Sequence, residues 1–335
     1  MKKVISPLLA ALMLVGMLAG CANQAEMPTV TATPAGSQAG SAADEKIRIV
    51  TTIFPEYDWV REILGDKADS AEITMLLDNG VDLHSYQPTA DDIIKLSDCD
   101  LFVYVGGESD EWVEGALKSA ANKDRKVINL LEILGDSVKE EETVEGMQEE
   151  EEDHEEKEYD EHVWLSLKNA KTLVAAISAA LQEIDPDNKD TYAANADAYG
   201  QKLSALDAEY RKAVSAGTYR TLLFGDRFPF RYLVDDYGLS YYAAFVGCSA
   251  ESEASFETVS FLARKVDEGK LPCVLTIEGK NHKIAETIVQ NTAGKNQKIL
   301  TMDSMQSTTS QDAAGGTTYL SLMEKNLDVL KEALG

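Results

Sequence analysis

Several side chains in this sequence could bind a divalent metal ion, and each lies close to the end of an expected strand or the start of an expected helix. His84 lies in "NGVDLHSYQPTADDI" and His162 in "YDEHVWLSLKNA". Asp226 lies in "LLFGDRFPF" and Asp303 in "ILTMDS". Two imidazoles and two carboxylates form a donor set suited to Zn²⁺, Mn²⁺ or Fe²⁺.

Each of these residues also has a purely structural interpretation. A single histidine in a loop is usually just exposed to solvent. Asp303 could cap the turn that follows its strand, and Asp226 could pair with Arg227 or Arg231. The residue types and their spacing therefore suggest a metal site but do not establish one.

Alternating strand-like and helix-like segments must position these side chains. Strands are expected at residues 47–54, 71–77, 100–107 and 126–131, and again at 221–225, 239–245, 272–279 and 298–304. Helix-like segments separate them, which favours parallel sheets covered on both faces. Residues 187–217 carry helix-forming residues with only Gly200 interrupting them, which predicts one long helix between the two halves.

The expected fold is therefore α/β, with two lobes that are each a parallel sheet flanked by helices. One long helix joins the lobes, and a cleft lies between them. In such sheets ligands bind beyond the carboxyl ends of the strands. The expected boundaries are an N-terminal lobe at 46–185, which includes an acidic loop at 137–161, a linking helix at 186–216, and a C-terminal lobe at 217–335.

The first residues have the features of an export signal. "MKK" is followed by the apolar run "VISPLLAALMLVGM" and then by "LAGC". The run is too short for a comfortable membrane span, and "LAGC" has the form of a bacterial lipobox, which makes Cys21 the lipidated residue. The alternative is an ordinary signal peptide. Residues 1–21 are thus interpreted as a lipoprotein signal peptide and the small, polar residues 22–45 as a flexible tether.

The overall charge and the cysteines narrow the function further. A formal net charge of -27 argues against nucleic acid and anionic membrane surfaces as partners. Cys99 precedes an apolar run and is expected to pack as a small hydrophobic residue. Cys248 and Cys273 could pair in an oxidising compartment. The sequence has no CxxC, which argues against a thiolate zinc site.

The chain resembles the zinc/manganese solute-binding lipoproteins of bacterial ABC importers, whose two lobes are joined by a single long helix. The matching stretches are "HSYQPTADDIIKLSDCDLFVYVG", "DEHVWLSLKNA", "DDYGL" and "MDSM". The resemblance covers essentially the whole mature chain. It implies that His84, His162 and Asp303 are metal ligands, with Trp164 and Leu165 anchoring the segment that carries His162.

The third ligand departs from the pattern of that family. A "H-D-A-F-x-Y" segment usually supplies a His or Glu three residues before an aromatic residue. In "DRFPFRY" the corresponding position is Arg227, which cannot bind a cation. Asp226 is the preferred substitute, and it is expected in the loop between the strand and the next helix. Glu278 and Glu253 are the alternatives.

The acidic tract between about Lys139 and Glu161 is expected to form no core, with like charges keeping it extended. It is similar in position to the His- and acid-rich accessory loop of zinc-specific members, although it carries only His154 before His162. It could concentrate cations near the cleft. The alternative is a solvated insertion with no role.

The resemblance implies a lipid-anchored protein at the extracytoplasmic face of the cell membrane. It would be a monomer that binds Zn²⁺ with high affinity and delivers it to an ABC permease and its ATPase. A manganese-specific member and a metal-binding surface adhesin are the alternatives. A zinc hydrolase would need an open coordination position and a general base, and no HExxH or other hydrolase motif is present. We therefore expect a binding protein rather than an enzyme.

Overall fold

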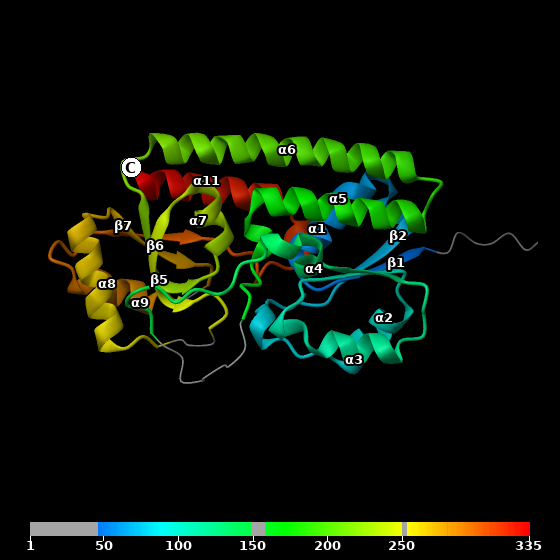
Figure 1. Ribbon diagram of the computed structural model, residues 1–335, viewed down its shortest axis with the longest axis horizontal. Coiled ribbons are helices and arrows are strands. Elements are labelled where there is room, and N and C mark those ends of the chain that lie inside the picture. The colour runs from blue at the N-terminus through cyan, green and yellow to red at the C-terminus, as the bar shows by residue number, and fades with distance from the viewer. Residues whose placement is uncertain (1–45, 149–157, 250–252, 280) are drawn as a thin grey trace, which may run out of the picture. The chain divides into compact units, whose positions relative to one another are not determined.

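The computed structural model describes residues 46–148, 158–249, 253–279 and 281–335 (Figure 1). The strands are β1 Ile47–Thr51, β2 Ala71–Met75, β3 Leu101–Tyr104, β4 Lys126–Asn129, β5 Thr221–Phe228, β6 Ser240–Val246, β7 Cys273–Ile277 and β8 Lys298–Met302. The α-helices are α1 Phe54–Leu64, α2 Ala90–Asp98, α3 Trp112–Ser119, α4 Leu130–Leu134, α5 Leu167–Ile184, α6 Lys189–Ala216, α7 Arg231–Tyr237, α8 Phe256–Gly269, α9 Lys283–Asn291, α10 Ser310–Ala314 and α11 Tyr319–Leu334.

Each half of the chain builds a four-stranded parallel sheet. The strand order is β2-β1-β3-β4 in the first lobe and β6-β5-β7-β8 in the second. Both sheets therefore place their first strand between the second and the third, and β2 and β6 occupy equivalent edge positions. The predicted α/β class, with two helix-flanked parallel sheets and a long helix between them, is confirmed.

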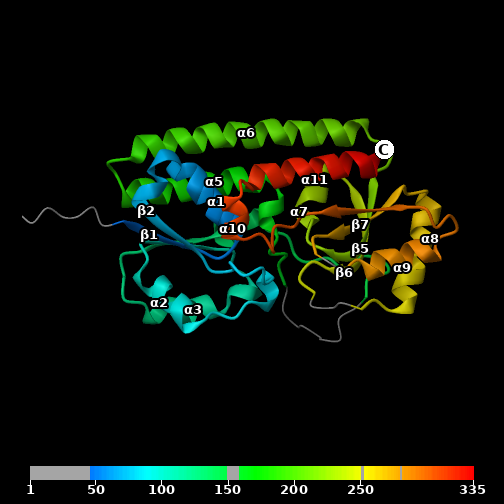
Figure 2. The ribbon, with the colours of Figure 1, turned by 180° about the vertical axis from the view of Figure 1, so that it is seen from behind.

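The long helix α6 lies along both lobes. It packs against them because apolar side chains recur along one of its faces. Tyr192, Tyr199, Leu203, Leu206 and Tyr210 are buried at intervals of three, four or seven residues, the spacing of one helix face. This face packs against α1 and α5 at one end and against α11 at the other. Both views show α6 lying along α5 and α11 (Figures 1 and 2).

Three hydrogen bonds tie distant segments together beside the turn that follows His162. The indole Nε1 of Trp164 donates to Ser304 O at 2.8 Å, and the Tyr319 hydroxyl donates to Trp164 O at 2.6 Å. The Tyr319 amide donates to Asp58 Oδ2 at 2.8 Å. Trp164 and Leu165 are fully buried, so the expected anchoring role of this pair is confirmed.

Two local expectations were wrong. Strand β5 does not end at Gly225 but continues to Phe228, because pairing with β6 resumes at Arg227 after a bulge. Asp226 therefore lies within the bulged part of a strand and not in a loop. The described part of the acidic tract is also not simply extended, since Met147 is buried against the core.

Residues 138–148, which we call the acidic strap, pack against the second lobe. The amide of Lys139 donates to the Tyr232 hydroxyl at 3.1 Å, and the amide of Gln148 donates to Ala244 O at 3.0 Å. Glu142 also forms an ion pair with Arg231. Within the described ranges, no helix is both long and apolar enough to cross a membrane.

Candidate metal centre

His84 is held in a short turn of the first lobe. It lies in the 3₁₀ turn Leu83–Ser85, where the Asp82 side chain caps the turn by accepting the His84 amide at 3.1 Å. The ring Nδ1 lies 2.9 Å from Ser109 Oγ and 3.4 Å from Glu161 Oε2. These contacts fix the ring through one nitrogen and leave Nε2 free to face another group.

His162 is fully buried and is held in the same manner. Its amide donates to Asp160 Oδ1 at 2.9 Å, and its ring Nδ1 lies 3.0 Å from the same oxygen. The 3₁₀ turn Val163–Leu165 follows directly and is anchored by Trp164. A carboxylate behind an imidazole orients the ring and raises its basicity at the other nitrogen.

The two histidines are 78 positions apart, yet their Nε2 atoms lie 3.2 Å from one another. Burial and the facing His162 lower the pKa of His84 to about 3, which keeps its ring neutral at pH 7. Burial also acts against the charged form of His162, but Asp160 and Glu161 outweigh it and raise its pKa. The electrostatics therefore keep the His84 ring neutral and favour a proton on His162, which a metal ion would have to displace.

A third side chain of a type that can bind metal ions, Cys248, lies beside this pair. One donor atom from each of His84, His162 and Cys248 lies within 4.8 Å of the others. Among the described residues no other group of three or more His, Cys, Asp or Glu side chains meets this condition. Because the sequence lacks a CxxC, Cys248 was not expected here. The signal that could have identified it is its position just after the carboxyl end of β6.

The described cysteines do not form a disulfide. Cys99, Cys248 and Cys273 are all free thiols, so Cys248 and Cys273 do not pair. Cys99 is fully buried, as expected of a small hydrophobic residue, and its thiol donates to Leu96 O at 3.2 Å.

The structure does not bring Asp226 into the group around the histidines. Its Oδ1 accepts the Arg227 amide at 2.9 Å and its Oδ2 accepts the Ile277 amide at 3.3 Å. Arg227 does not pair with Asp226 but forms an ion pair with Asp82, with Nη2 2.6 Å from Oδ2. A guanidinium therefore lies close to the turn that carries His84.

The other predicted oxygen donors also bind neighbouring groups of the protein. Asp303 Oδ1 accepts the Met305 amide at 2.8 Å, and Glu278 accepts the amide and the hydroxyl of Ser304 at 2.6 and 2.7 Å. Burial and the nearby Glu278 raise the pKa of Asp303 to about 6. Glu253 is exposed. The roles of these acids as ligands stay predictions, and His154 and Cys21 lie outside the described residues.

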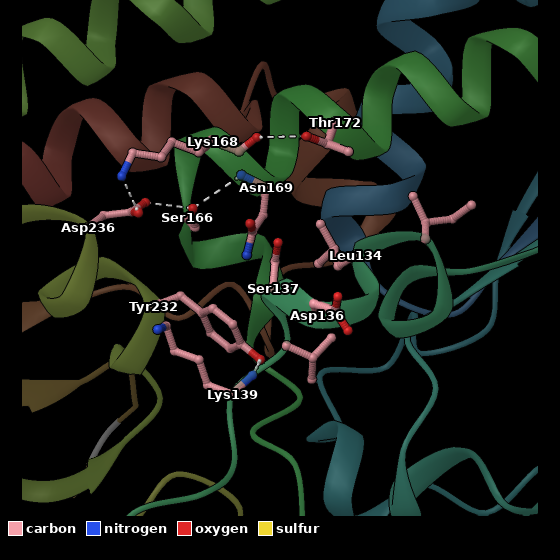
Figure 3. A pocket seen from close by; sticks show the side chains of 12 residues that line it. Leu134, Asp136, Ser137, Lys139, Ser166, Lys168, Asn169, Thr172, Tyr232 and Asp236 are labelled. Carbon is pink, nitrogen blue, oxygen red and sulfur yellow. Dashed lines mark hydrogen bonds and ion pairs between the residues drawn. The ribbon is translucent and has the colours of Figure 1, made fainter.

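A polar cavity of about 450 Å³ lies elsewhere, among α4, α5, α7 and the start of the acidic strap. Figure 3 shows the residues that line it. Among them, Lys168 Nζ and Ser166 Oγ each donate to the Asp236 carboxylate at 2.6 Å. Tyr232, in the same wall, donates to Asp160 O at 2.7 Å. The residues that line the cavity include no histidine, and its two lysines, Lys139 and Lys168, form ion pairs with Asp235 and Asp236.

Residues 49–333 match the family described as zinc-uptake complex component A, periplasmic (ZnuA). The zinc-binding lipoprotein AdcA of Streptococcus pneumoniae is 32% identical over 338 residues, covering 99% of this chain and 61% of AdcA. This chain thus spans less than two thirds of that relative.

Two further similarities cover nearly the whole of the matched protein. The high-affinity zinc uptake system protein ZnuA of Bacillus subtilis is 31% identical over 316 residues, covering 91% of this chain and 93% of ZnuA. The crystal structure of the Zn(II)-bound ZnuA-like domain of S. pneumoniae AdcA has a TM-score of 0.67 at 31% identity. It covers 86% of this chain and 99% of that domain.

Proposed function

Because the chain belongs to the zinc-uptake complex component A family, we propose that it binds Zn²⁺ outside the cytoplasm and delivers the ion to an ABC-type permease. A cytosolic ATPase would power that permease. The protein performs no catalysis in this scheme, because its task is to bind the ion, dock and release it. It acts as a monomer, and an acylated Cys21 holds it at the extracytoplasmic face of the membrane.

The observation that carries this proposal is the 3.2 Å separation of the two Nε2 atoms. Zinc–nitrogen bonds of about 2.0–2.1 Å in a tetrahedral site place two nitrogens about 3.3–3.4 Å apart. His84 and His162 are therefore spaced almost as two ligands of one zinc ion would be. The other ring nitrogens contact Ser109 and Asp160, as metal-bound imidazoles do in proteins.

Oxygen donors would complete the site in the scheme that the resemblance implies. Asp303 and Asp226 are the proposed donors, and Glu278 and Glu253 are the alternatives. Each buried acid already accepts backbone hydrogen bonds, for example the one from Met305 to Oδ1 of Asp303. A carboxylate has two acceptor oxygens, so the other oxygen can bind the ion while that hydrogen bond is kept. The acidic tract would attract cations toward the site through long-range electrostatics.

The proposal is tested on the metal-stripped full chain by titration with Zn²⁺ and Mn²⁺ against a competing chelator. His84→Ala and His162→Ala should each weaken zinc binding by orders of magnitude, because each removes an imidazole donor. His282→Ala is the matched control, since His282 is described but lies outside the donor group. Melting curves of the metal-free variants show whether the fold is kept.

The same titration separates the alternatives. A manganese-specific protein would retain Mn²⁺ against an equal concentration of Zn²⁺ and chelator. A structural lipoprotein that only keeps the fold would bind neither ion tightly. Wild-type zinc affinity in His84→Ala would overturn the assignment of the site itself.

A further inference from the structure

The loop after β6 places a thiol at the predicted metal site. β2 and β6 are equivalent edge strands of the two sheets, and the chain leaves them toward His84 and Cys248 respectively. The donor atoms of these two residues and of His162 lie within 4.8 Å of one another. One donor thus follows the second strand of each lobe, and the third precedes α5.

Close packing holds the Cys248 loop against the histidine pair. A Cβ atom added at Gly247 would lie 3.1 Å from Cε1 and 3.2 Å from Nδ1 of His162, and 2.9 Å from Phe228 O. Only a residue without a side chain allows the backbone this close to the imidazole. The loop that carries Cys248 is therefore placed directly beside His162.

The acidic strap holds the same loop from the other side. Glu141 Oε1 accepts the amide of Cys248 at 3.0 Å, which joins the strap to the residue that carries the thiol. Burial and the carboxylates of Glu141, Asp160 and Glu161 raise the pKa of the Cys248 thiol. Before a metal ion arrives, the thiol is therefore protonated.

We propose that Cys248 Sγ is the third protein ligand of the zinc ion, so that the site presents two imidazole nitrogens and one thiolate. This inference rests on the proposed zinc-binding function and names a ligand that the sequence pattern did not. When Zn²⁺ binds, the zinc–sulfur bond replaces the S–H bond, and the proton leaves to solvent. Tetrahedral zinc then has one position left for an oxygen donor or water.

The geometry of the group fits this coordination. With zinc–nitrogen and zinc–sulfur bonds of about 2.1 and 2.3 Å, sulfur and nitrogen ligands of one tetrahedral ion lie about 3.6 Å apart. The observed upper limit of 4.8 Å leaves only a small side-chain adjustment. By contrast, none of Asp226, Asp303 or Glu278 belongs to the group.

A thiolate also bears on which metal the site selects. Thiolates prefer zinc and other soft or borderline ions, whereas carboxylates and water suit manganese. A site with two imidazoles and a thiolate should therefore bind Zn²⁺ in preference to Mn²⁺. Cys248 would be the residue that determines this preference.

Cobalt substitution tests the sulfur ligand directly, because a thiolate bound to Co²⁺ gives a near-ultraviolet charge-transfer band that nitrogen and oxygen ligands do not give. The wild-type full chain loaded with Co²⁺ should show the band, and Cys248→Ser and Cys248→Ala should lack it. Cys273→Ser is the matched control, since Cys273 is a free, buried thiol in β7. It should keep the band.

Zinc affinity gives an independent measurement on the same variants. Cys248→Ser should weaken zinc binding by more than the about 10–100-fold loss that follows a change in an outer hydrogen-bond partner. Its manganese affinity should change much less. Circular dichroism of the metal-free variants checks that the fold is unaltered.

The outcomes separate this inference from the proposed function. Suppose that the wild type binds Co²⁺ and Zn²⁺ tightly but shows no charge-transfer band, and that Cys248→Ser binds Zn²⁺ with the affinity of the wild type. The thiol is then not a ligand, and the proposed zinc site remains without it. If neither ion binds tightly to the wild type, the proposed function itself fails, and the sulfur ligand fails with it.

Discussion

Arg227 in β5 reaches across to the first lobe and forms an ion pair with Asp82, with Nη2 2.6 Å from Oδ2. The same guanidinium donates from Nη1 to Ser249 O at 3.2 Å. Asp82 in turn caps the turn that carries His84. One side chain of the second lobe therefore contacts both the cap of the first histidine and the residue that follows Cys248.

Replacing Arg227 by Gln should destabilise the metal-free protein. Asp82 would keep its backbone contact to His84 but lose its cationic partner, and both side chains of this pair are largely shielded from solvent. We expect the free energy of unfolding to fall by about 1–3 kcal/mol. Urea denaturation, monitored by circular dichroism, measures the change in the free energy of unfolding.

The control for this variant is Arg211→Gln. Arg211 pairs with Asp207 one turn away on α6, where the arginine side chain is 49% exposed. Exposed ion pairs of this kind contribute about 0.3–0.5 kcal/mol to stability, so the urea midpoint of unfolding should hardly change. Equal losses of unfolding free energy in the two variants would mean that the Arg227–Asp82 pair stabilises the protein no more than an exposed ion pair does.

Asp160→Asn should weaken zinc binding while leaving the fold intact. Asparagine can still accept the His162 amide through its side-chain oxygen, but it no longer offers a carboxylate to Nδ1. Loss of such an outer partner typically costs about 10–100-fold in metal affinity. Chelator competition measures it, with Asp236→Asn as a control that lies in the cavity away from the histidines. An unchanged affinity in Asp160→Asn would contradict the positioning role.

Local patterns were sufficient to predict the strands and most of the helices. Thr89 caps α2, because its hydroxyl accepts the Asp92 amide at 3.2 Å. The eight strands among the described residues lie at the predicted segments, since short apolar runs between helical segments leave few other arrangements. His84 and His162 were candidates because of their positions next to such elements, and the family resemblance implied that they are ligands. The structure brings their rings together.

The features that sequence analysis missed depend on contacts between segments far apart in the chain. Gly225 was interpreted as the end of a strand, but a bulge lets β5 resume its pairing with β6 at Arg227. The absence of a CxxC argued against a thiolate ligand, and Cys248 was expected to pair with Cys273 if at all, although the fold supplies two histidines as its neighbours. Met147, an apolar residue within the acidic tract, packs into the core of the folded chain. No local periodicity reports any of these contacts.

Stability should depend on pH through Asp58, which is buried beneath Tyr319. Burial raises the pKa of Asp58 from 3.8 to about 6, although the Tyr319 amide opposes the shift. Between these values the folded state binds more protons than the unfolded state, so the free energy of unfolding falls as pH rises from about 4 to 6. The two-unit shift corresponds to about 3 kcal/mol for this one group.

Asp58→Asn tests this pH dependence. The asparagine oxygen can still accept the Tyr319 amide, and it carries no charge to bury at neutral pH. The variant should therefore lose part of the decline between pH 4 and 6 and gain stability at pH 7 relative to the wild type. Urea denaturation at a series of pH values between 4 and 7 measures both effects. If the free energy of unfolding depended on pH in the same way in the variant and the wild type, Asp58 would titrate normally in the folded protein.

Gly247→Ala should damage both stability and zinc binding, because the added methyl group has no space. Its carbon would lie 2.9 Å from Phe228 O and 3.1 Å from Cε1 of His162, so either the imidazole or the Cys248 loop must move. We expect a loss of about 1–3 kcal/mol in the free energy of unfolding, as for other overpacked sites, together with weaker zinc binding.

Gly115→Ala is the control, since a Cβ atom at Gly115 in α3 has no neighbour within 4 Å. That change should stabilise its helix by up to about 1 kcal/mol and leave zinc binding unchanged. If Gly247→Ala bound zinc as tightly as Gly115→Ala, the close contact between the Cys248 loop and His162 would not be needed for the site.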